Sequence, residues 1–230
     1  MTLPSTNTAR NWRHFAARAF CAQWFWVFNR YTIRGARNIP ETGPFILASN
    51  HASFIDPPLL SSALPKDREI YFFARKSLFM GWFGRLIASL NAVPVDRDGE
   101  SDLSAFRTVF KLLNNGHGLL LFPEGTRTPD GHLQVPRKGL GLIACRTGVP
   151  IIPARVCGTH TYWGRNQKLP RLFAPLGVVF GPALHPAQYD PGKNHPERFQ
   201  VASWVATAAI AALPDLYPAL PNRQPQPQRD

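Results

Sequence analysis

Short apolar runs alternate with helix-like segments along most of the chain. The apolar runs are Phe45–Ala48, Ile70–Phe73, Ala92–Val95, Gly118–Phe122, Ile151–Val156 and Val178–Phe180. A run without polar positions, such as Gly118–Phe122, is typical of a strand that is covered on both faces. Strands that alternate with helices predict an α/β fold with a largely parallel central sheet and helices on both faces.

Helical patterns lie between and after these runs. They cover Ser77–Leu90, Ser101–Gly116, Lys138–Thr147 and Pro196–Pro214. In the second segment apolar residues recur every three or four positions, and the glycine that follows suits a helix end. In the last segment the first proline suits the start of a helix and the second cannot continue it.

The N-terminal segment is strongly aromatic and has a helical period from Asn11 to Tyr31. Its apolar residues are spaced by four, at Trp12, Ala16, Phe20, Trp24 and Phe28, and Arg13, Arg18 and Arg30 lie off this stripe. The first forty residues contain six Arg and no acidic residue. Aromatic bodies with basic tips suit the interface of an anionic bilayer, so we expect an amphipathic helix on a membrane surface. The alternative is a core helix that packs on the domain.

These patterns divide the chain into three parts. We predict an N-terminal interfacial segment over 1–34, an α/β domain over 35–214 and a disordered tail over 215–230. The tail ends in the sequence PNRQPQPQRD, whose polar, proline-rich composition does not form a packed core.

Composition and charge narrow the class of protein. A chain of 230 residues with 44% hydrophobic residues can bury one core, which excludes global disorder. With 26 Lys and Arg against 14 Asp and Glu, the net charge of +12 favours partners such as anionic lipids or acidic small molecules. No recognisable nucleic-acid module accompanies this charge, so we expect no nucleic-acid partner.

Cysteine usage and hydropathy bear on location. Three Cys without a C-x2-C pair exclude a disulfide framework and a zinc ribbon, and they suit a reducing compartment. The sequence has no apolar stretch of 18 residues and no signal-peptide pattern. We therefore expect the chain at the cytoplasmic face of a membrane, as a peripheral or monotopic protein.

The first group of candidate site residues follows the Phe45–Ala48 strand. His51 and Asp56, five residues apart on a strand-to-helix turn, can meet through their side chains. The carboxylate would fix the imidazole tautomer and leave the other ring nitrogen to act as a base. Asn50 and Ser53 suit a turn and a helix cap, and we also count them as candidates for substrate binding. A purely structural role for the pair is the alternative.

The second group follows the Gly118–Phe122 strand, so it should lie at the same edge of the sheet as His51. Gly125 permits a tight bend and the close approach of a ligand. The planar guanidinium of Arg127 suits a phosphate, and Glu124 could orient that guanidinium or bind a hydroxyl. Arg97, just after the Ala92–Val95 strand, is a further candidate ligand for an anion.

Four blocks of sequence together resemble a known family. NHASFIDP, VPVDRD, FPEGTRT and VPIIPA are similar, in order and spacing, to the blocks of the HxxxxD acyltransferases of lysophosphatidic acid and glycerol 3-phosphate. The stretch FARKSLF also resembles a family block, although Ser77 stands where the family usually has Glu. The resemblance covers roughly Ile33 to Ala183.

The resemblance implies transfer of a fatty acyl chain from a thioester to a hydroxyl of a glycerolipid. The donor would be acyl-CoA or acyl carrier protein, and the expected acceptor is the lysophospholipid 1-acyl-sn-glycerol 3-phosphate. By carry-over His51 is the base and Asp56 its partner. The implied substrate-binding residues are Asn50, Ser53, Arg97, Glu124, Gly125, Thr126 and Arg127. We expect no metal and no cofactor, and the lack of a G-x-S-x-G elbow favours direct transfer.

Three alternatives stay open at this point. Another acceptor, such as glycerol 3-phosphate, a different lysophospholipid or a lyso-aminolipid, would use the same base. A binder of anionic lipid without catalytic activity would need the charge but not the His51–Asp56 pair. A metal-dependent hydrolase would use those two residues with His117 and Glu124, although His117 precedes its strand and Glu124 follows it.

Overall fold

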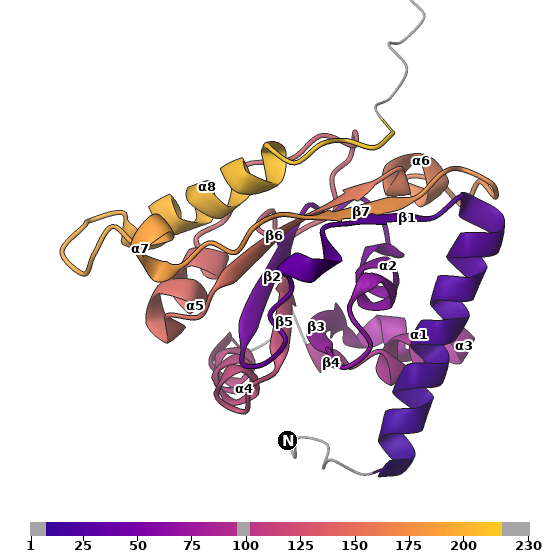
Figure 1. Ribbon diagram of the computed structural model, residues 1–230, viewed down its shortest axis with the longest axis horizontal. Helices are drawn as coiled ribbons and strands as arrows, with labels where there is room; N and C mark the ends of the chain where they lie inside the picture. The colour runs from indigo at the N-terminus through magenta and orange to yellow at the C-terminus, as the bar shows by residue number, and fades with distance from the viewer. Residues whose placement is uncertain (1–7, 96–101, 218–230) are drawn as a thin grey trace, which may run out of the picture.

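The computed structural model describes residues 8–95 and 102–217 (Figure 1). Within these residues the chain forms a seven-stranded sheet of order β1-β7-β6-β2-β5-β3-β4. The strands are β1 (Thr32–Arg34), β2 (Phe45–Ser49), β3 (Ile70–Arg75), β4 (Ala92–Val95), β5 (Gly118–Leu121), β6 (Ile151–Cys157) and β7 (Gly177–Phe180). Every neighbouring pair is parallel except β6 and β7. The predicted α/β fold with a largely parallel sheet is confirmed.

Helices cover both faces of this sheet. They are α1 (Thr8–Asn29), α2 (Asp56–Ala63), α3 (Gly81–Ser89), α4 (Asp102–Asn114), α5 (Gly139–Thr147), α6 (Thr159–Trp163), α7 (Pro186–Tyr189) and α8 (Arg198–Ala211), with 3-10 turns η1 (Ala36–Asn38) and η2 (Lys76–Phe79). Figure 1 shows α1, α2 and α3 on one side, with α4, α5 and α8 on the other. Each face of the sheet has its own hydrophobic core. Phe45 and Leu47 of β2 belong to the core under α1, α2 and α3, whereas Ile46 and Ala48 belong to the core under α4, α5 and α8. This double burial explains why the first four residues of the strand, Phe45–Ala48, are all apolar.

The register of the central strands brings two loops together. Ala48 of β2 is level with Leu121 of β5, and the strands run parallel. The chain therefore leaves both strands at the same edge, with the segment from Asn50 beside the segment from Phe122. Loops at the carboxyl edge of such a sheet are where α/β proteins build their sites.

The structure differs from the expected elements in three places. The helix predicted over Ser77–Leu90 is divided into η2 and α3, with Met80 extended between them. The bend brings Gly84 so close to the backbone of Phe79 that a Cβ would lie 2.2 Å from its carbonyl carbon, so this position has no room for a side chain. The helix expected from Pro196 begins at Arg198, and β1 was not expected because three residues are too short for a pattern.

The boundaries of the predicted segments also change. Strand β1 belongs to the same sheet as the rest of the domain, although the sequence groups it with the N-terminal segment 1–34. At the other end, Asp215 forms an ion pair with Arg155 at 3.1 Å, and the Tyr217 hydroxyl lies 3.0 Å from that of Thr32. The first residues of the predicted tail 215–230 are thus held on the domain, and 218–230 lie outside the described residues.

Helix α1 has two different faces. His14, Arg18, Cys21, Phe25 and Asn29 are buried against the domain. The predicted apolar stripe faces outward instead: Trp12, Phe20 and Trp24 are exposed, and so are Phe15, Trp26 and Val27. Core packing and an exposed aromatic surface therefore occur on the same helix. In the described chain, none of the helices has the length and apolar character needed to span a bilayer.

Arg18 corrects one expectation about this helix. The sequence places it among the basic tips that face a membrane, but it is buried against the segment that follows α2. Its guanidinium donates hydrogen bonds of 2.7–3.2 Å to four carbonyl oxygens, those of Leu64, Pro65, Lys66 and Arg68. A guanidinium has five N–H donors, so it can satisfy several carbonyl groups left open at a helix end.

Candidate active site

A cavity of about 520 Å³ opens at the carboxyl edge of the sheet. Its walls come from the ends of β3 and β5, from η2 and α3, and from the loops after β2, β5 and α6. Both His51 and Arg127 line it, so the two segments that the sequence predicts at one edge of the sheet meet in one cavity.

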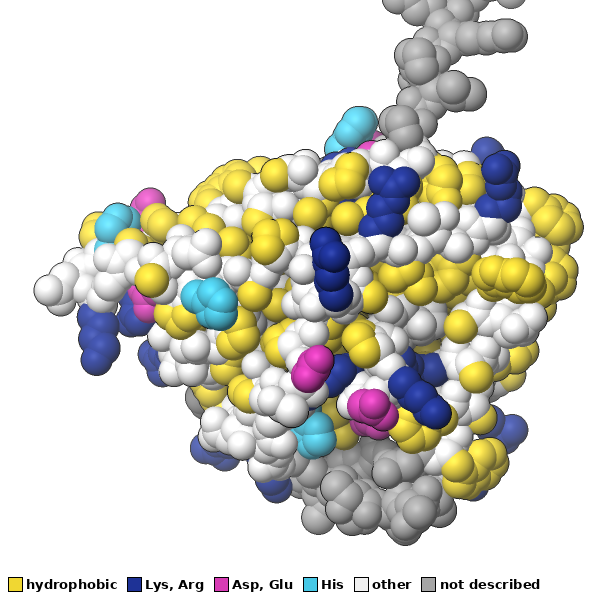
Figure 2. All heavy atoms as spheres, in the orientation of Figure 1, with side chains coloured by type: hydrophobic (Ala, Val, Ile, Leu, Met, Phe, Trp, Pro, Cys, Tyr) yellow, Lys and Arg dark blue, Asp and Glu magenta, His cyan; other side chains and the backbone are white. Residues whose placement is uncertain are grey.

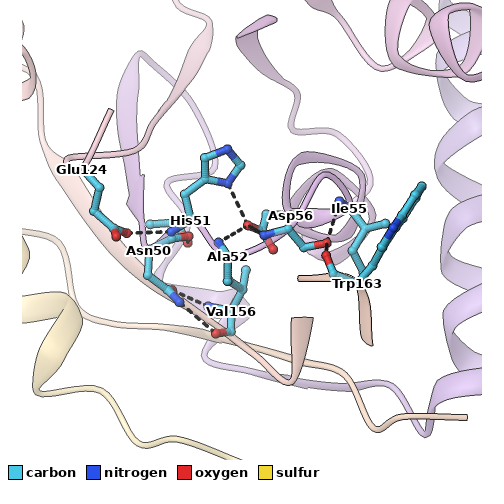
Figure 3. A network of polar contacts seen from close by, with 10 residues as sticks. Asn50, His51, Ala52, Ile55, Asp56, Glu124, Val156 and Trp163 are labelled. Atoms are coloured by element: carbon cyan, nitrogen blue, oxygen red, sulfur yellow. Dashed lines mark hydrogen bonds and ion pairs between the residues drawn. The ribbon is translucent and has the colours of Figure 1, made fainter. Parts of the chain in front are cut away.

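His51 and Asp56 form a close pair (Figure 3). The ring Nδ1 lies 2.8 Å from Asp56 Oδ2, which also accepts the backbone N–H groups of Ala52 and Ser53 at 2.7 and 2.8 Å. Asp56 is fully buried at the start of α2, where the helix dipole favours a negative charge. The carboxylate accepts a hydrogen bond from the Nδ1–H group, so the proton of the neutral ring stays on Nδ1 and Nε2 is the basic atom of the cavity-lining imidazole.

The imidazole is also held from one side. The Phe122 ring stacks on it at 3.9 Å between centroids, with 13° between the planes. Phe122 directly follows β5, so this contact joins the two loops at the cavity. A ring fixed by both a carboxylate and a stacked aromatic loses little freedom when it meets a substrate.

Glu124 acts on the backbone of His51 rather than on a side chain. Its Oε1 accepts the His51 N–H at 2.8 Å, and Oε2 accepts the Gln134 N–H at 3.1 Å. Burial raises the pKa of Glu124 to about 7, while the two N–H donors act in the opposite direction. The His51 carbonyl in turn accepts the N–H of Thr128 at 2.8 Å. Glu124 thus joins the loop that contains His51 to the segment that contains Gln134, and its expected role in orienting Arg127 or binding a hydroxyl stays a prediction.

Asn50 and Ser53 are also occupied by the protein. The Asn50 amide exchanges two hydrogen bonds, of 3.1 and 2.9 Å, with the backbone of Val156. Ser53 Oγ donates to the Trp163 carbonyl at 2.7 Å and accepts the N–H of Ile55 at 3.3 Å. Neither side chain lines the cavity. The structure thus gives both side chains a role in holding the loops, and their contact with substrate stays a prediction.

Gly125, Thr126 and Arg127 do line the cavity. Gly125 has φ of +68°, which agrees with the tight bend expected there. The Arg127 guanidinium carbon lies 3.5 Å from the centroid of the Phe54 ring, a stacking contact that keeps its planar edge available. Burial lowers the pKa of Arg127, and the neighbouring charge of Arg165 adds to this shift. Arg97 lies outside the described residues.

Two further arginines in the cavity are missing from the sequence prediction. Arg75 closes β3, at the same carboxyl edge, and belongs to the FARKSLF block. The rule that located His51 could therefore have located Arg75. Arg165 follows α6 and no buried strand, so no local pattern indicates its position.

The alternative metal site has no cluster to support it among the described residues. Over 8–95 and 102–217, no three His, Cys, Asp or Glu side chains gather in a way that could hold a metal ion. His117 lies before β5 and contacts the Tyr71 ring at 4.9 Å, whereas Glu124 follows that strand.

Comparison with known proteins identifies one family. The acyltransferase family model matches residues 30–157. The 1-acyl-sn-glycerol-3-phosphate acyltransferase of Pseudomonas aeruginosa is 28% identical over 211 residues, which are 87% of this chain and 79% of that protein. The enzyme of the same name from Bacillus subtilis is 30% identical over 155 residues, 66% of this chain and 72% of the relative.

Plant relatives are longer, and a solved structure shares the fold. The chain spans 44% of the length of the chloroplastic relative from Brassica napus and 42% of that from Arabidopsis thaliana, at 31% and 30% identity. The crystal structure of the 1-acyl-sn-glycerophosphate (LPA) acyltransferase, PlsC, from Thermotoga maritima matches with a TM-score of 0.70 and 26% identity. The match covers 91% of this chain and 81% of that one.

Proposed function

The chain belongs to the acyltransferase family, and on that premise we propose that it moves a fatty acyl chain from an acyl thioester to the free hydroxyl of 1-acyl-sn-glycerol 3-phosphate. The observation that carries the proposal is one cavity lined by both a carboxylate-paired imidazole and the guanidinium of Arg127. A base beside an anion site is what transfer to a phosphate-bearing alcohol requires.

The proposed reaction needs a base that removes the proton of the acceptor hydroxyl. Nε2 of His51 takes the proton of the acceptor hydroxyl while that oxygen attacks the thioester carbonyl carbon. The C–S bond then breaks, and the thiolate leaves with the proton that the imidazole held. Asp56 stabilises the imidazolium formed between these steps, since its charge lies 2.8 Å from Nδ1. The products are the ester and a free thiol.

The acceptor phosphate would be held by Arg127, with Arg97 as the second proposed ligand. We expect Arg127→Ala to raise the KM for the acceptor by about tenfold or more, because a charge-assisted hydrogen bond contributes about 1.5–3 kcal/mol. The KM for the acyl donor should change less. Steady-state kinetics with each substrate varied in turn measures both. Arg146→Ala, an exposed arginine on α5, is the control. An unchanged acceptor KM would remove Arg127 from the site.

Donor and acceptor identity are open within the family. Acyl-CoA and acyl carrier protein present the same thioester, and glycerol 3-phosphate or other lysolipids present a comparable hydroxyl. An acyl-transfer assay over a panel of lyso-acceptors, with each donor, tests the proposed function directly. We expect the highest kcat/KM with 1-acyl-sn-glycerol 3-phosphate. Absence of transfer to every glycerolipid acceptor would contradict the proposal.

The outward face of α1 supports attachment to a membrane surface. Figure 2 shows hydrophobic side chains gathered on the side of the molecule where α1 lies, with basic side chains at their edges. Trp12 is 60% exposed, Phe20 57% and Trp26 69%. Such a face, on a chain of net charge +12, suits the headgroup region of an anionic bilayer. We propose that the enzyme binds there as a peripheral or monotopic protein on the cytoplasmic side.

Substitutions on this face test membrane attachment without removing the core contacts of α1. We expect the double variant Phe20→Glu, Trp26→Glu to lose most of its co-sedimentation with anionic vesicles. Its melting temperature should stay nearly unchanged. Trp204→Glu, on the exposed side of α8, is the matched control. Deletion of residues 1–30 would be less informative, because Cys21 and Phe25 belong to the core. Undiminished sedimentation of the double variant would assign α1 a structural role alone.

A further inference from the structure

Arg165 lies at the proposed active site but outside the four sequence blocks that resemble the acyltransferase family. It follows α6, in a turn closed by a hydrogen bond of 3.1 Å from the Gln167 N–H to the Gly164 carbonyl. The family model ends at residue 157, before this turn. The Arg165 side chain nevertheless lines the cavity that contains His51.

The turn that carries Arg165 is fastened to the catalytic loop. The Trp163 carbonyl accepts the Ser53 hydroxyl at 2.7 Å, and the Trp163 ring lies edge-on to the Phe54 ring at 6.1 Å. Gln167 holds the other side of the turn, since its Oε1 accepts the Gly164 N–H and its carbonyl accepts the Trp163 indole N–H, both at 3.2 Å. These contacts fix the turn that carries Arg165 to Ser53, in the same loop as His51 and Asp56.

The described part of the cavity lining is rich in positive charge. Arg75, Arg127 and Arg165 all line it, and among residues 8–95 and 102–217 the lining includes no Asp or Glu, while the buried Asp56 lies behind His51. Within the described residues none of the three forms an ion pair with a carboxylate. Arg165 Nη1 donates a hydrogen bond of 3.5 Å to the backbone carbonyl of Arg127, and after burial the positive charge of Arg165 is the next cause of the lowered pKa of Arg127. Like charges repel, so this arrangement is stabilised by an anion with more than one negative charge.

We propose that Arg165 determines acceptor specificity, by binding the second negative charge of a phosphate monoester. This inference rests on the proposed function and names a residue that the function does not require. A phosphate monoester has a second pKa near 6, so it is close to a dianion at neutral pH. A lysophospholipid with an esterified headgroup carries one charge on its phosphate, and the headgroup ester removes one of the charged oxygens that a second guanidinium could bind. The residue therefore favours a bare phosphate over a headgroup diester.

The test compares two acceptors in Arg165→Gln. With 1-acyl-sn-glycerol 3-phosphate we expect the acceptor KM to rise about tenfold, with kcat and the donor KM nearly unchanged. With 1-acyl-glycero-3-phosphocholine we expect little change, so the preference between the two acceptors falls by a similar factor. Arg165→Lys should recover part of the loss, because the charge stays but the bidentate fork is lost. Arg171→Gln, an exposed arginine farther along the same segment that is not in the cavity lining, is the matched control.

The outcomes separate this inference from the proposed function. If the wild-type chain transfers acyl groups and Arg165→Gln leaves the acceptor preference unchanged, the role of Arg165 is overturned but the proposed function is not. A rise in the donor KM without a rise in the acceptor KM overturns it too, since the anion would then belong to the donor. A wild-type chain inactive with all acceptors overturns the proposed function and the inference with it. Thermal melting checks that each variant is folded.

Discussion

Replacing His51 with alanine is expected to lower the rate of acyl transfer by about 10²–10⁴-fold. A hydroxyl is a poor nucleophile until its proton leaves, and His51 is the cavity-lining base that Asp56 orients. The measurement is release of thiol from acyl-CoA in the presence of acceptor, under saturation with both substrates. His132→Ala, an exposed histidine in the segment after Thr128, is the control and should retain full activity.

The same variant separates catalysis from binding. The His51 side chain is partly exposed and its backbone makes the contacts to Glu124 and Thr128, so alanine leaves those contacts in place. We therefore expect normal vesicle binding and nearly normal stability. Thiol release at the wild-type rate in His51→Ala would show that another group is the base, whereas vesicle binding without any thiol release by the wild-type chain would favour a lipid-binding protein without this chemistry.

Asp56→Asn is the second prediction with a large effect, a loss of about 10²-fold in kcat at neutral pH. The charged Oδ2 accepts Nδ1 of His51 and two backbone N–H groups. A neutral amide no longer stabilises the imidazolium, and its NH₂ can donate to Nδ1, which moves the ring proton to Nε2. The ring would then present a proton where the reaction needs a lone pair.

The measurement is the pH dependence of kcat together with a melting curve. Asparagine is nearly isosteric, so we expect the variant to fold, with a small loss of stability because a negative charge at the start of α2 is removed. Asp67→Asn, an exposed carboxylate of the segment after α2, is the control for a general charge effect. Near-normal turnover in Asp56→Asn would count decisively against the pair as the catalytic unit.

The fold follows from the sequence wherever a pattern is local and long enough. The run Gly118–Phe122 predicts a doubly covered strand, and β5 occupies Gly118–Leu121. The three-residue strand β1 could not be predicted, because its pairing with β7 depends on a partner about 145 residues away. The break at Met80 brings Gly84 against the backbone of Phe79, a contact with no room for a Cβ, and a helical period does not encode such a close approach.

Orientation was harder to predict than secondary structure. The aromatic face of α1 points outward, as the expected interfacial helix requires, but Arg18, which the sequence places among the outward basic residues, packs on the segment after α2. Hydrophobicity alone would bury the aromatic face. Arg18 is buried instead because four carbonyl groups beyond α2 accept its N–H groups, and such partners become visible only in three dimensions.

The sequence alone determined the α/β class and the His51–Asp56 pair. Residues five apart on one turn meet through local geometry, and a continuous apolar run reveals a buried strand. Tertiary structure decided what the other polar residues do: Glu124 and Ser53 hold backbone groups, while Arg165 reaches the cavity from a segment without a motif. The physical reason is that hydrophobic periodicity reports burial along the chain, whereas the partner of a polar side chain depends on which distant segments the packed sheet brings together.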